Sequence, residues 1–439
     1  MATRSTRETT FVNVVNHKRK AINVSKTNKK MKVYKFGGAS VKNAEGVRNL
    51  KEIVAHAGDD LMVVISAMGK TTNALERLVE ALSKHDEQTA ENEWLALLDS
   101  HVHTAMQLGL RPNEDIRFPM MPEYDHTRSY DHNYDQIVSL GEIMSTQIVA
   151  VFLLKSGIPT EWWNMPKLLR TDATYREAQV DMLTSAQVIR AGWDRPNRPK
   201  VVVAQGFIGG TADGYRTTLG REGSDYTAAL MGNFLDAESV TIWKDVPGIL
   251  NADPRLVANT VKIDRLTYYD AVELAYSGAQ VIHPKTIRPL ENKSIPLYVK
   301  PFGDYTAPGS VIAAEADPIN VPVYIWRTNQ VLITLRAKDF SFVLEESLTH
   351  IFNIIHQNRL KVSLIQSSAV TISVCVDNSR FVQPAIEQLK EAYRVVWNEG
   401  LSLLTIRGTN PEILKREQEG RDIMLSQITR RTAKLVIKD

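Results

Sequence analysis

Cysteine is almost absent from this chain, because Cys375 is the only one among its 439 residues. An internal disulfide is therefore excluded, and the mostly apolar segment around it, residues 370–376, predicts a buried and unreactive thiol. Such cysteine usage suits a reducing compartment, and we expect a cytoplasmic protein.

Long apolar runs are missing too. The longest one with a helical pattern, residues 143–154, contains Ser145, Thr146 and Gln147 and is shorter than the ~18 residues that a membrane span requires. The composition, 43% hydrophobic and 23% charged, is ordinary for a soluble globular protein. We therefore expect no membrane partner.

Acidic residues are scarce in residues 1–30, where Glu8 stands against eight lysines and arginines. Because the whole chain has a net charge of only +3, the remainder is acidic, which argues against nucleic acid as the main partner. We interpret this leader as a disordered extension. A nucleic-acid arm, a transit peptide and a start site placed upstream of Met31 are the alternatives.

Strand-like and helix-like segments alternate over most of the chain, whose length suits two or three domains. This alternation predicts an α/β fold with a mainly parallel central sheet sandwiched by helices. Runs typical of buried strands lie at residues 31–36, 61–66, 200–204, 239–243 and 295–299. Helical patterns lie at residues 42–56, in a stretch that ends at residue 98, near residue 186, and at 226–234 and 270–276.

Two further segments lack this alternation. Residues 111–135 are rich in Pro, Asp, His and Asn, and we interpret them as a loop whose His126 and His132 do not have the spacing of metal ligands. After the first unit closes near residue 310, short strands and helices between 331 and 397 form a β-α-β-β-α pattern. A second copy begins at 401–406 and is shorter.

Lys35 belongs to the first motif along the chain that indicates chemistry. It ends a strand and is followed by Gly37 and Gly38, which have no Cβ and so let the backbone approach an anion. This arrangement predicts a phosphate cradle in which Lys35 offsets charge during phosphoryl transfer. A strand-end lysine that merely reaches solvent is the alternative.

Ser66 follows the second strand, and Thr72 lies in the polar turn after it. Because open α/β sheets bind ligands at the carboxyl ends of their strands, these hydroxyls predict contacts to a small polar substrate, with a merely polar turn as the alternative. The Gly69-Lys70-Thr71 segment is not a P-loop, since Val64 stands where that motif requires glycine.

Glu142 and Arg221 are candidate partners for the two charged ends of an amino acid. Glu142 begins an apolar helical pattern without a nearby basic residue and suits a substrate ammonium, or else it complements the helix N-terminus. The glycine-flanked Arg221 suits bidentate capture of a carboxylate, or else a structural salt bridge. Ser224 and Asp225, which follow, have the pattern of a helix cap.

Lys244, Asp245 and Arg255 follow the strand at residues 239–243. They offer charges for nucleotide binding, although ordinary turn chemistry explains each of them alone.

Together these segments resemble the aspartate kinases of the amino-acid kinase superfamily. The resemblance covers about residues 31–315, and its motifs stand in the family's order: KFGGAS, SAMGKTTN, GEIMST, GFIGG, GREGSDYTAAL, WKDVPGILNADPR and SGAQVIHPKT. It implies an amino-acid kinase fold and transfer of the γ-phosphoryl of ATP to the β-carboxylate of L-aspartate. The product, 4-phospho-L-aspartate, serves lysine, threonine and methionine biosynthesis.

The resemblance also implies roles for single residues. Lys35, Gly37 and Gly38 would face the phosphates, and Asp225 would orient the lysine. The aspartate-binding positions are Thr72, Glu142, Arg221 and Ser224, to which we add Ser66, and the nucleotide-binding positions are Lys244, Asp245 and Arg255. Mg²⁺ would arrive with ATP, and no metal ligands of the protein's own are expected.

Departures from the family pattern occur at Ala39, Glu222 and Leu250, and most seriously at Gln280. Many relatives have a phosphate-binding lysine where Gln280 stands. Two unit charges ~4 Å apart interact by ~4 kcal/mol at an effective dielectric constant of about 20, so the loss of this lysine should weaken the interaction with the phosphates. Our hypothesis is that Lys244, which stands where threonine is usual, supplies the missing cation.

The C-terminal region, residues 316–439, resembles ACT domains. In this family such domains often bind lysine or threonine and join subunits, so we expect a homodimer and a feedback amino acid. Two full copies would need more residues, and the second copy is expected to be truncated. The alternatives to an aspartate kinase are a sibling kinase for N-acetylglutamate, glutamate or a nucleotide, and a catalytically silent amino-acid sensor.

Overall fold

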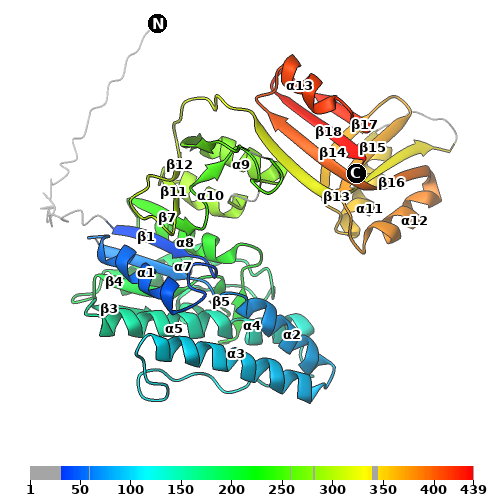
Figure 1. Cartoon of the computed structure of the whole chain (residues 1–439). Coiled ribbons are helices and arrows are strands. Elements are labelled where there is room, and N and C mark those ends of the chain that lie inside the picture. The colour runs from blue at the N-terminus through cyan, green and yellow to red at the C-terminus, as the bar shows by residue number, and fades with distance from the viewer. Residues whose placement is uncertain (1–30, 59, 258, 280–281, 339–344, 439) are drawn as a thin grey trace, which may run out of the picture.

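A computed structural model of the chain describes residues 31–438 except positions 59, 258, 280–281 and 339–344. The predicted leader, residues 1–30, and Gln280 therefore lie outside the described residues. Figure 1 shows a large α/β unit, coloured blue to green, beside a smaller lobe built on an antiparallel sheet, coloured yellow to red.

The α/β unit is built on an eight-stranded sheet with the order β10-β12-β11-β7-β1-β2-β4-β3. All of its neighbouring strands run parallel except β11 and β12. The predicted parallel sheet is therefore confirmed. The strands are β1 (Met31–Phe36), β2 (Asp60–Ile65), β3 (Thr160–Trp163), β4 (Val201–Gln205), β7 (Ser239–Lys244), β10 (Arg265–Thr267), β11 (Leu297–Pro301) and β12 (Ser310–Ala313).

Helices cover both faces of this sheet. Successive side chains of a strand point to opposite faces, so each strand contributes to two separate cores. Val33 and Val64 pack in one core with α7 (Met182–Trp193), α8 (Gly223–Phe234) and α10 (Pro284–Glu291). Phe36 and Val63 pack in the other with α1 (Ala44–Ala55), α3 (Glu87–Gln107) and α5 (Leu140–Lys155). The remaining elements of the unit are α2 (Thr71–Ser83), α4 (Tyr130–Val138), α6 (Met165–Leu168), α9 (Tyr268–Ser277), β5 (Ile208–Gly210), β6 (Arg216–Thr218), β8 (Ile249–Leu250) and β9 (Lys262–Ile263).

The helices α4 and α5 follow each other directly and correct one prediction. The loop expected at residues 111–135 ends earlier, because α4 begins at Tyr130 and includes the buried His132. The combined segment Tyr130–Lys155 is long and apolar enough to cross a membrane, but 72% of its most apolar window is buried inside the protein. These helices therefore belong to the core of the α/β unit.

The smaller lobe is a six-stranded sheet with the order β14-β15-β13-β16-β18-β17, and all of its neighbouring strands run antiparallel. Two 15-residue strands at its centre pair along most of their length, and the short strands predicted at 331–335 and 394–397 are parts of them. Cys375 is fully buried in β15. The elements are β13 (Val323–Ala337), α11 (Glu345–Gln357), β14 (Val362–Ser367), β15 (Thr371–Asp377), α12 (Val382–Ala392), β16 (Tyr393–Arg407), α13 (Pro411–Gln418), β17 (Ile423–Ile428) and β18 (Thr432–Lys438).

Candidate active site

A cleft of about 1300 Å³ opens at the carboxyl ends of four adjacent parallel strands, β7, β1, β2 and β4. Lys244 is the last residue of β7, Lys35 is the penultimate residue of β1, and Ser66 directly follows β2. Ligands bind at this edge of open α/β sheets. Eight of the predicted site residues line the cleft: Lys35, Ser66, Thr72, Glu142, Arg221, Ser224, Asp225 and Lys244.

Lys35 and Asp225 form the buried charge pair at the inner end of the cleft. Lys35 has the same strand orientation as Val33, so its side chain faces α8, whose first turn carries Asp225. The Lys35 Nζ and the Asp225 Oδ1 are 2.6 Å apart, and the two residues are only 8% and 3% exposed. The lysine is thus held in one orientation while its charge remains at the cleft.

Lys244 is the second cation near Asp225, with its Nζ 3.9 Å from Asp225 Oδ2. Burial alone would raise the pKa of the Asp225 carboxyl, but the charges of Lys35 and Lys244 outweigh it and hold that pKa below its usual value. Asp225 is therefore ionised at neutral pH. Lys35 and Lys244 thus bring two cations to this part of the cleft, and cations there suit a phosphate group.

The glycine turn after β1 packs backbone against backbone. The amide of Gly69 donates to the Gly38 carbonyl at 2.9 Å, and a Cβ on Gly38 would lie 2.6 Å from the Ala67 carbonyl oxygen. No larger residue fits there without displacing one of the two loops. Gly37 lies beside Lys35, because a Cβ added to it would be 3.6 Å from the Lys35 Nζ.

We expect Gly38→Ala to lower kcat/KM at least ~10-fold, because displacement of catalytic groups by ~1 Å can cost about 100-fold. Gly303→Ala is the matched control, since a Cβ there meets no atom within 4 Å. Steady-state kinetics and thermal melting of both variants check the prediction. A Gly38→Ala enzyme with the kinetics of the control would show that the close approach of the loops is unimportant.

Glu142 lies in the first turn of α5, is only 3% exposed and lines the cleft. Its Oε1 accepts from the Ala67 amide at 3.2 Å, whereas its Oε2 has no hydrogen-bond partner among the described residues. Burial raises the pKa of Glu142 to about 8, and the Ala67 amide and the Lys35 charge oppose this only in part. A buried carboxylate oxygen without a partner suits an ammonium group of a ligand.

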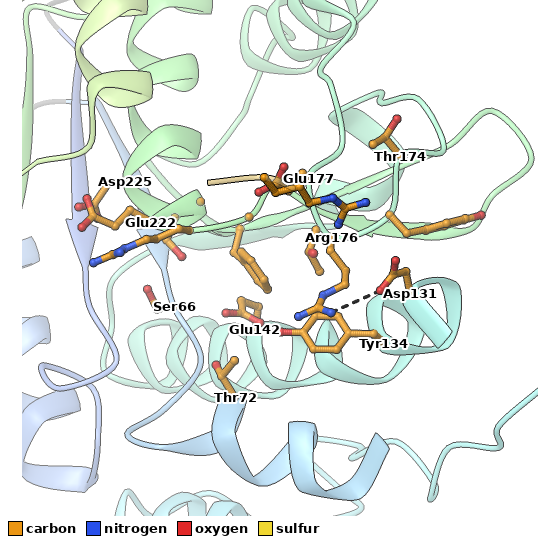
Figure 2. A pocket seen from close by; sticks show the side chains of 18 of the residues that line it. Ser66, Thr72, Asp131, Tyr134, Glu142, Thr174, Arg176, Glu177, Glu222 and Asp225 are labelled. Carbon is orange, nitrogen blue, oxygen red and sulfur yellow. Dashed lines mark hydrogen bonds and ion pairs between the residues drawn. The ribbon is translucent and has the colours of Figure 1, made fainter. Parts of the chain in front are cut away.

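Arg176 is a cleft residue that the sequence motifs do not indicate. Its backbone amide donates to the Asp135 carboxylate at 3.0 Å, and its guanidinium lies 4.3 Å from the centre of the Tyr134 ring. Figure 2 shows this side chain together with Glu142 and Thr72 and marks its ion pair with Asp131 at 3.4 Å. Arg176 and Arg221 thus place two guanidinium groups in the cleft.

Asp135 is the buried group that organises this wall. Its carboxylate also accepts from the amide and the hydroxyl of Thr218, at 2.8 and 2.7 Å. Burial outweighs these hydrogen bonds and raises the pKa of Asp135 to about 6. The Asp135 carboxylate therefore joins the backbone of Arg176 to the strand β6.

The turn before α8 corrects a second prediction. Ser224 and Asp225 are not the helix cap, because α8 begins at Gly223 and its N-cap is Glu222, which makes no capping hydrogen bond with its side chain. Glu222 has a φ of 54°, a left-handed conformation that costs a residue with a Cβ roughly 1–2 kcal/mol. Its buried Oε2 has no hydrogen-bond partner among the described residues. The departure noted at Glu222 therefore falls on a position that glycine would occupy without strain.

Some predicted nucleotide-binding residues do not line the cleft. Arg255 is exposed and pairs with Asp253, with its Nη2 2.6 Å from the aspartate Oδ2, and Asp245 is not among the lining residues. Gln280 lies outside the described residues. Gly37 and Gly38, predicted to face the phosphates, are not among the lining residues either. The roles assigned to all of these site residues stay predictions.

Comparisons with known proteins agree with this architecture. The sequence profile of the Amino acid kinase family matches residues 30–301. Lysine-sensitive aspartokinase 3 of Escherichia coli K12 is 31% identical over 400 residues, which cover 86% of this chain and 87% of that protein. Aspartokinase 1, chloroplastic, of Arabidopsis thaliana is 29% identical over 413 residues, which cover 86% and 70% of the two chains.

A crystal structure of E. coli aspartokinase III in complex with aspartate and ADP (R-state) has a TM-score of 0.77 and 26% identity. The match covers 93% of this chain and 96% of that one. The same enzyme in complex with lysine and aspartate (T-state) gives a TM-score of 0.72.

Fold and site together define an α/β enzyme with a cleft at the carboxyl edge of a parallel sheet, and the lysines that line this cleft suit an anion. The profile match over residues 30–301 and the E. coli relative then settle the family. The chain belongs to the amino acid kinase family.

Proposed function

We propose that this protein is an aspartate kinase, which transfers the γ-phosphoryl of ATP to the β-carboxylate of L-aspartate and forms 4-phospho-L-aspartate. The observation that carries the proposal is the pairing of two charge patterns in one cleft. Lys35 and Lys244 offer positive charge for a phosphate, while Arg221 and Glu142, once it has lost its proton, offer opposite charges for an amino acid. The aspartokinase relatives, and the E. coli structure with aspartate and ADP, support it.

In this proposal the residues position the substrates and offset charge, as phosphoryl transfer requires. Lys35 contacts the transferring phosphoryl, and Asp225 fixes the lysine. Glu142 accepts from the substrate ammonium, and Arg221 binds the α-carboxylate. The hydroxyls of Ser66, Thr72 and Ser224 complete the amino-acid site. A β-carboxylate oxygen then attacks the γ-phosphorus, the bond from this phosphorus to the bridging oxygen breaks, and ADP leaves, without a covalent enzyme intermediate.

Mg²⁺ enters this proposal with the nucleotide. Mg²⁺ commonly binds substrate phosphates together with one or two carboxylates. No group of three or more His, Cys, Asp or Glu that could hold a metal occurs in the described part of the chain. A metal ion carried by ATP would offset part of the charge of its phosphates.

A panel of acceptors tests this function. ADP release should depend on L-aspartate and should be weak with glutamate, N-acetylglutamate and UMP, which are substrates of sibling kinases. A preference for one of these three would overturn the choice of acceptor. ATP binding without ADP release in the presence of any acceptor would favour the silent sensor.

Lys244 is proposed to compensate for Gln280. Its position beside Asp225 supports the idea, because a cation there also lies near Lys35. We expect Lys244→Met to lower kcat roughly 10-fold and to raise the KM for ATP, as the side chain is only 25% exposed. The exposed Lys415 on α13 gives the control variant Lys415→Met. Turnover of Lys244→Met near that of the wild type would exclude the compensation.

The domain assignment and the assembly also remain proposals. We propose an amino-acid kinase domain over residues 31–315 and an ACT-like region over 316–439 that binds a feedback amino acid, lysine or threonine, and joins a cytoplasmic homodimer. The names of the lysine-sensitive relative and of the T-state complex with lysine favour lysine. Light scattering, with and without lysine, tests the assembly, and a monomer under both conditions would exclude the dimer.

A further inference from the structure

The cleft has a second wall, which comes from the C-terminal lobe. Besides the residues of the α/β unit, it is lined by His356, Arg359, Leu360 and Lys361. These residues span the end of α11 and the turn that leads into β14. The candidate active site is therefore built from two parts of the chain that are more than one hundred residues apart in sequence.

Arg327 ties this turn to the α/β unit. From β13, its Nε donates to the Ser277 carbonyl at 3.0 Å and its Nη2 to the Tyr276 carbonyl at 2.8 Å, both at the carboxyl end of α9. A cation is favourable there because the last carbonyls of a helix carry partial negative charge. The guanidinium packs on the backbone of Gly278, where a Cβ would lie 2.5 Å from the Arg327 Nε.

The same guanidinium holds the start of β14. Its Nη1 donates to the Ser363 hydroxyl at 3.2 Å and lies 3.4 Å from Asp377 Oδ1 in β15. Ser363 is two residues after Lys361. One arginine thus fixes the turn of the smaller lobe against α9 and keeps Lys361 at the cleft.

Arg221, Arg359 and Lys361 bring three cations to this part of the cleft. No ion pair links Arg221, Arg359 or Lys361 to a carboxylate in the part of the chain that the structure describes. Partial burial and the charges of Arg327 and Arg221 lower the pKa of Lys361, whereas the Asp377 carboxylate raises it. Cations that line a cavity without a direct ion pair favour an anionic ligand there.

We propose that Lys361, supported by Arg359, is a substrate-binding residue that shares the free carboxylate of the acceptor amino acid with Arg221. This inference rests on the proposed function. The acceptor is favoured over the nucleotide because Lys361 lines the same cleft as Arg221, the residue proposed to bind the acceptor. Lys35 and Lys244, the cations proposed to bind phosphate, are instead both paired with Asp225. The C-terminal lobe then contributes directly to acceptor affinity, and the site is incomplete without it.

The test compares Lys361→Met with Lys415→Met, which removes the same charge from an exposed position of the same lobe. We expect Lys361→Met to raise the KM for aspartate roughly 3- to 10-fold, as for a solvent-exposed charged contact. Its kcat and its KM for ATP should stay within about two-fold of the wild type, and Lys361→Arg should restore most of the affinity. The KM for aspartate should also rise less steeply with added KCl in Lys361→Met than in Lys415→Met.

Each outcome bears on one claim. An unchanged KM for aspartate in Lys361→Met would overturn the inference and leave the proposed function intact. A rise confined to the KM for ATP would also overturn it, because the cation would then serve the nucleotide. A wild-type enzyme without aspartate-dependent turnover would overturn the proposed function and this inference together. Equal melting temperatures of the two variants exclude a folding defect as the cause of a raised KM.

Discussion

Replacing Lys35 with methionine is expected to lower kcat at least ~1000-fold. The lysine places a unit charge where the transferring phosphoryl develops charge, and such a pair ~4 Å apart interacts by ~4 kcal/mol at an effective dielectric constant of about 20. That energy corresponds to roughly three powers of ten in rate. The KM for aspartate should change little, since Lys35 pairs with Asp225 and not with the groups assigned to the amino acid.

The matched control for this variant addresses folding. Lys35→Met leaves Asp225 almost fully buried with only Lys244 nearby, and an uncompensated buried carboxylate is destabilising. The double variant Lys35→Met/Asp225→Asn removes both charges and should recover the melting temperature without recovering turnover. Catalysis that is undiminished in a folded Lys35→Met enzyme would exclude the lysine from the reaction.

Replacing Glu142 with glutamine is expected to raise the KM for aspartate roughly 30-fold or more. Loss of one partner of a buried, hydrogen-bonded charge pair costs about 2 kcal/mol or more, and 2 kcal/mol is about 30-fold in affinity. Glutamine keeps the shape of the side chain, so the Ala67 amide retains an acceptor. Glu91→Gln, at an exposed site on α3, is the control. Equal KM values in the two variants would remove Glu142 from the amino-acid site.

The raised pKa of Glu142 makes this site sensitive to pH. In the free protein the pKa is about 8, so the side chain is mostly protonated at pH 7 and must lose its proton to bind an ammonium group. The KM for aspartate should therefore fall as the pH rises from 6 to 8, and Glu142→Gln should flatten that profile. A wild-type KM that does not change over this range would contradict the assignment.

The raised pKa of Glu142 also makes the stability of the folded protein depend on pH. The native protein binds a proton at Glu142 between the ordinary glutamate pKa of 4.5 and about 8, where the unfolded chain has lost it. This stabilisation is complete below pH 4.5 and is lost as the pH rises to about 8, with each pKa unit worth about 1.4 kcal/mol. Melting temperatures at pH 6 and 8 should therefore differ less in Glu142→Gln than in the wild type.

The central sheet was predictable because its strands are covered on both faces. Such strands are nearly continuous apolar runs, and the run predicted at residues 61–66 overlaps β2, whose six residues are all buried. The start of α4 was not predictable in the same way. Its Asp135 is polar but buried, and the hydrogen bonds from Arg176 and Thr218 that permit the burial come from residues far along the chain.

The residues of the candidate site also fall into a predictable and an unpredictable group. Lys35, Glu142 and Arg221 lie in short motifs at strand and helix ends, where local sequence indicates their chemistry. Arg176 enters the cleft only because Asp135 pins its backbone, and Lys361 only because Arg327 ties two lobes together. Contacts between distant segments leave no periodic pattern in the sequence, so neither residue could be predicted from it.

The transfer of the phosphoryl group to a carboxylate is tested most directly by trapping the product with hydroxylamine. Wild-type protein with ATP, Mg²⁺ and L-aspartate should form the β-hydroxamate of aspartate in step with ADP, and Lys35→Met should form neither. ADP release without hydroxamate, or hydroxamate formed equally by Lys35→Met, would contradict the account.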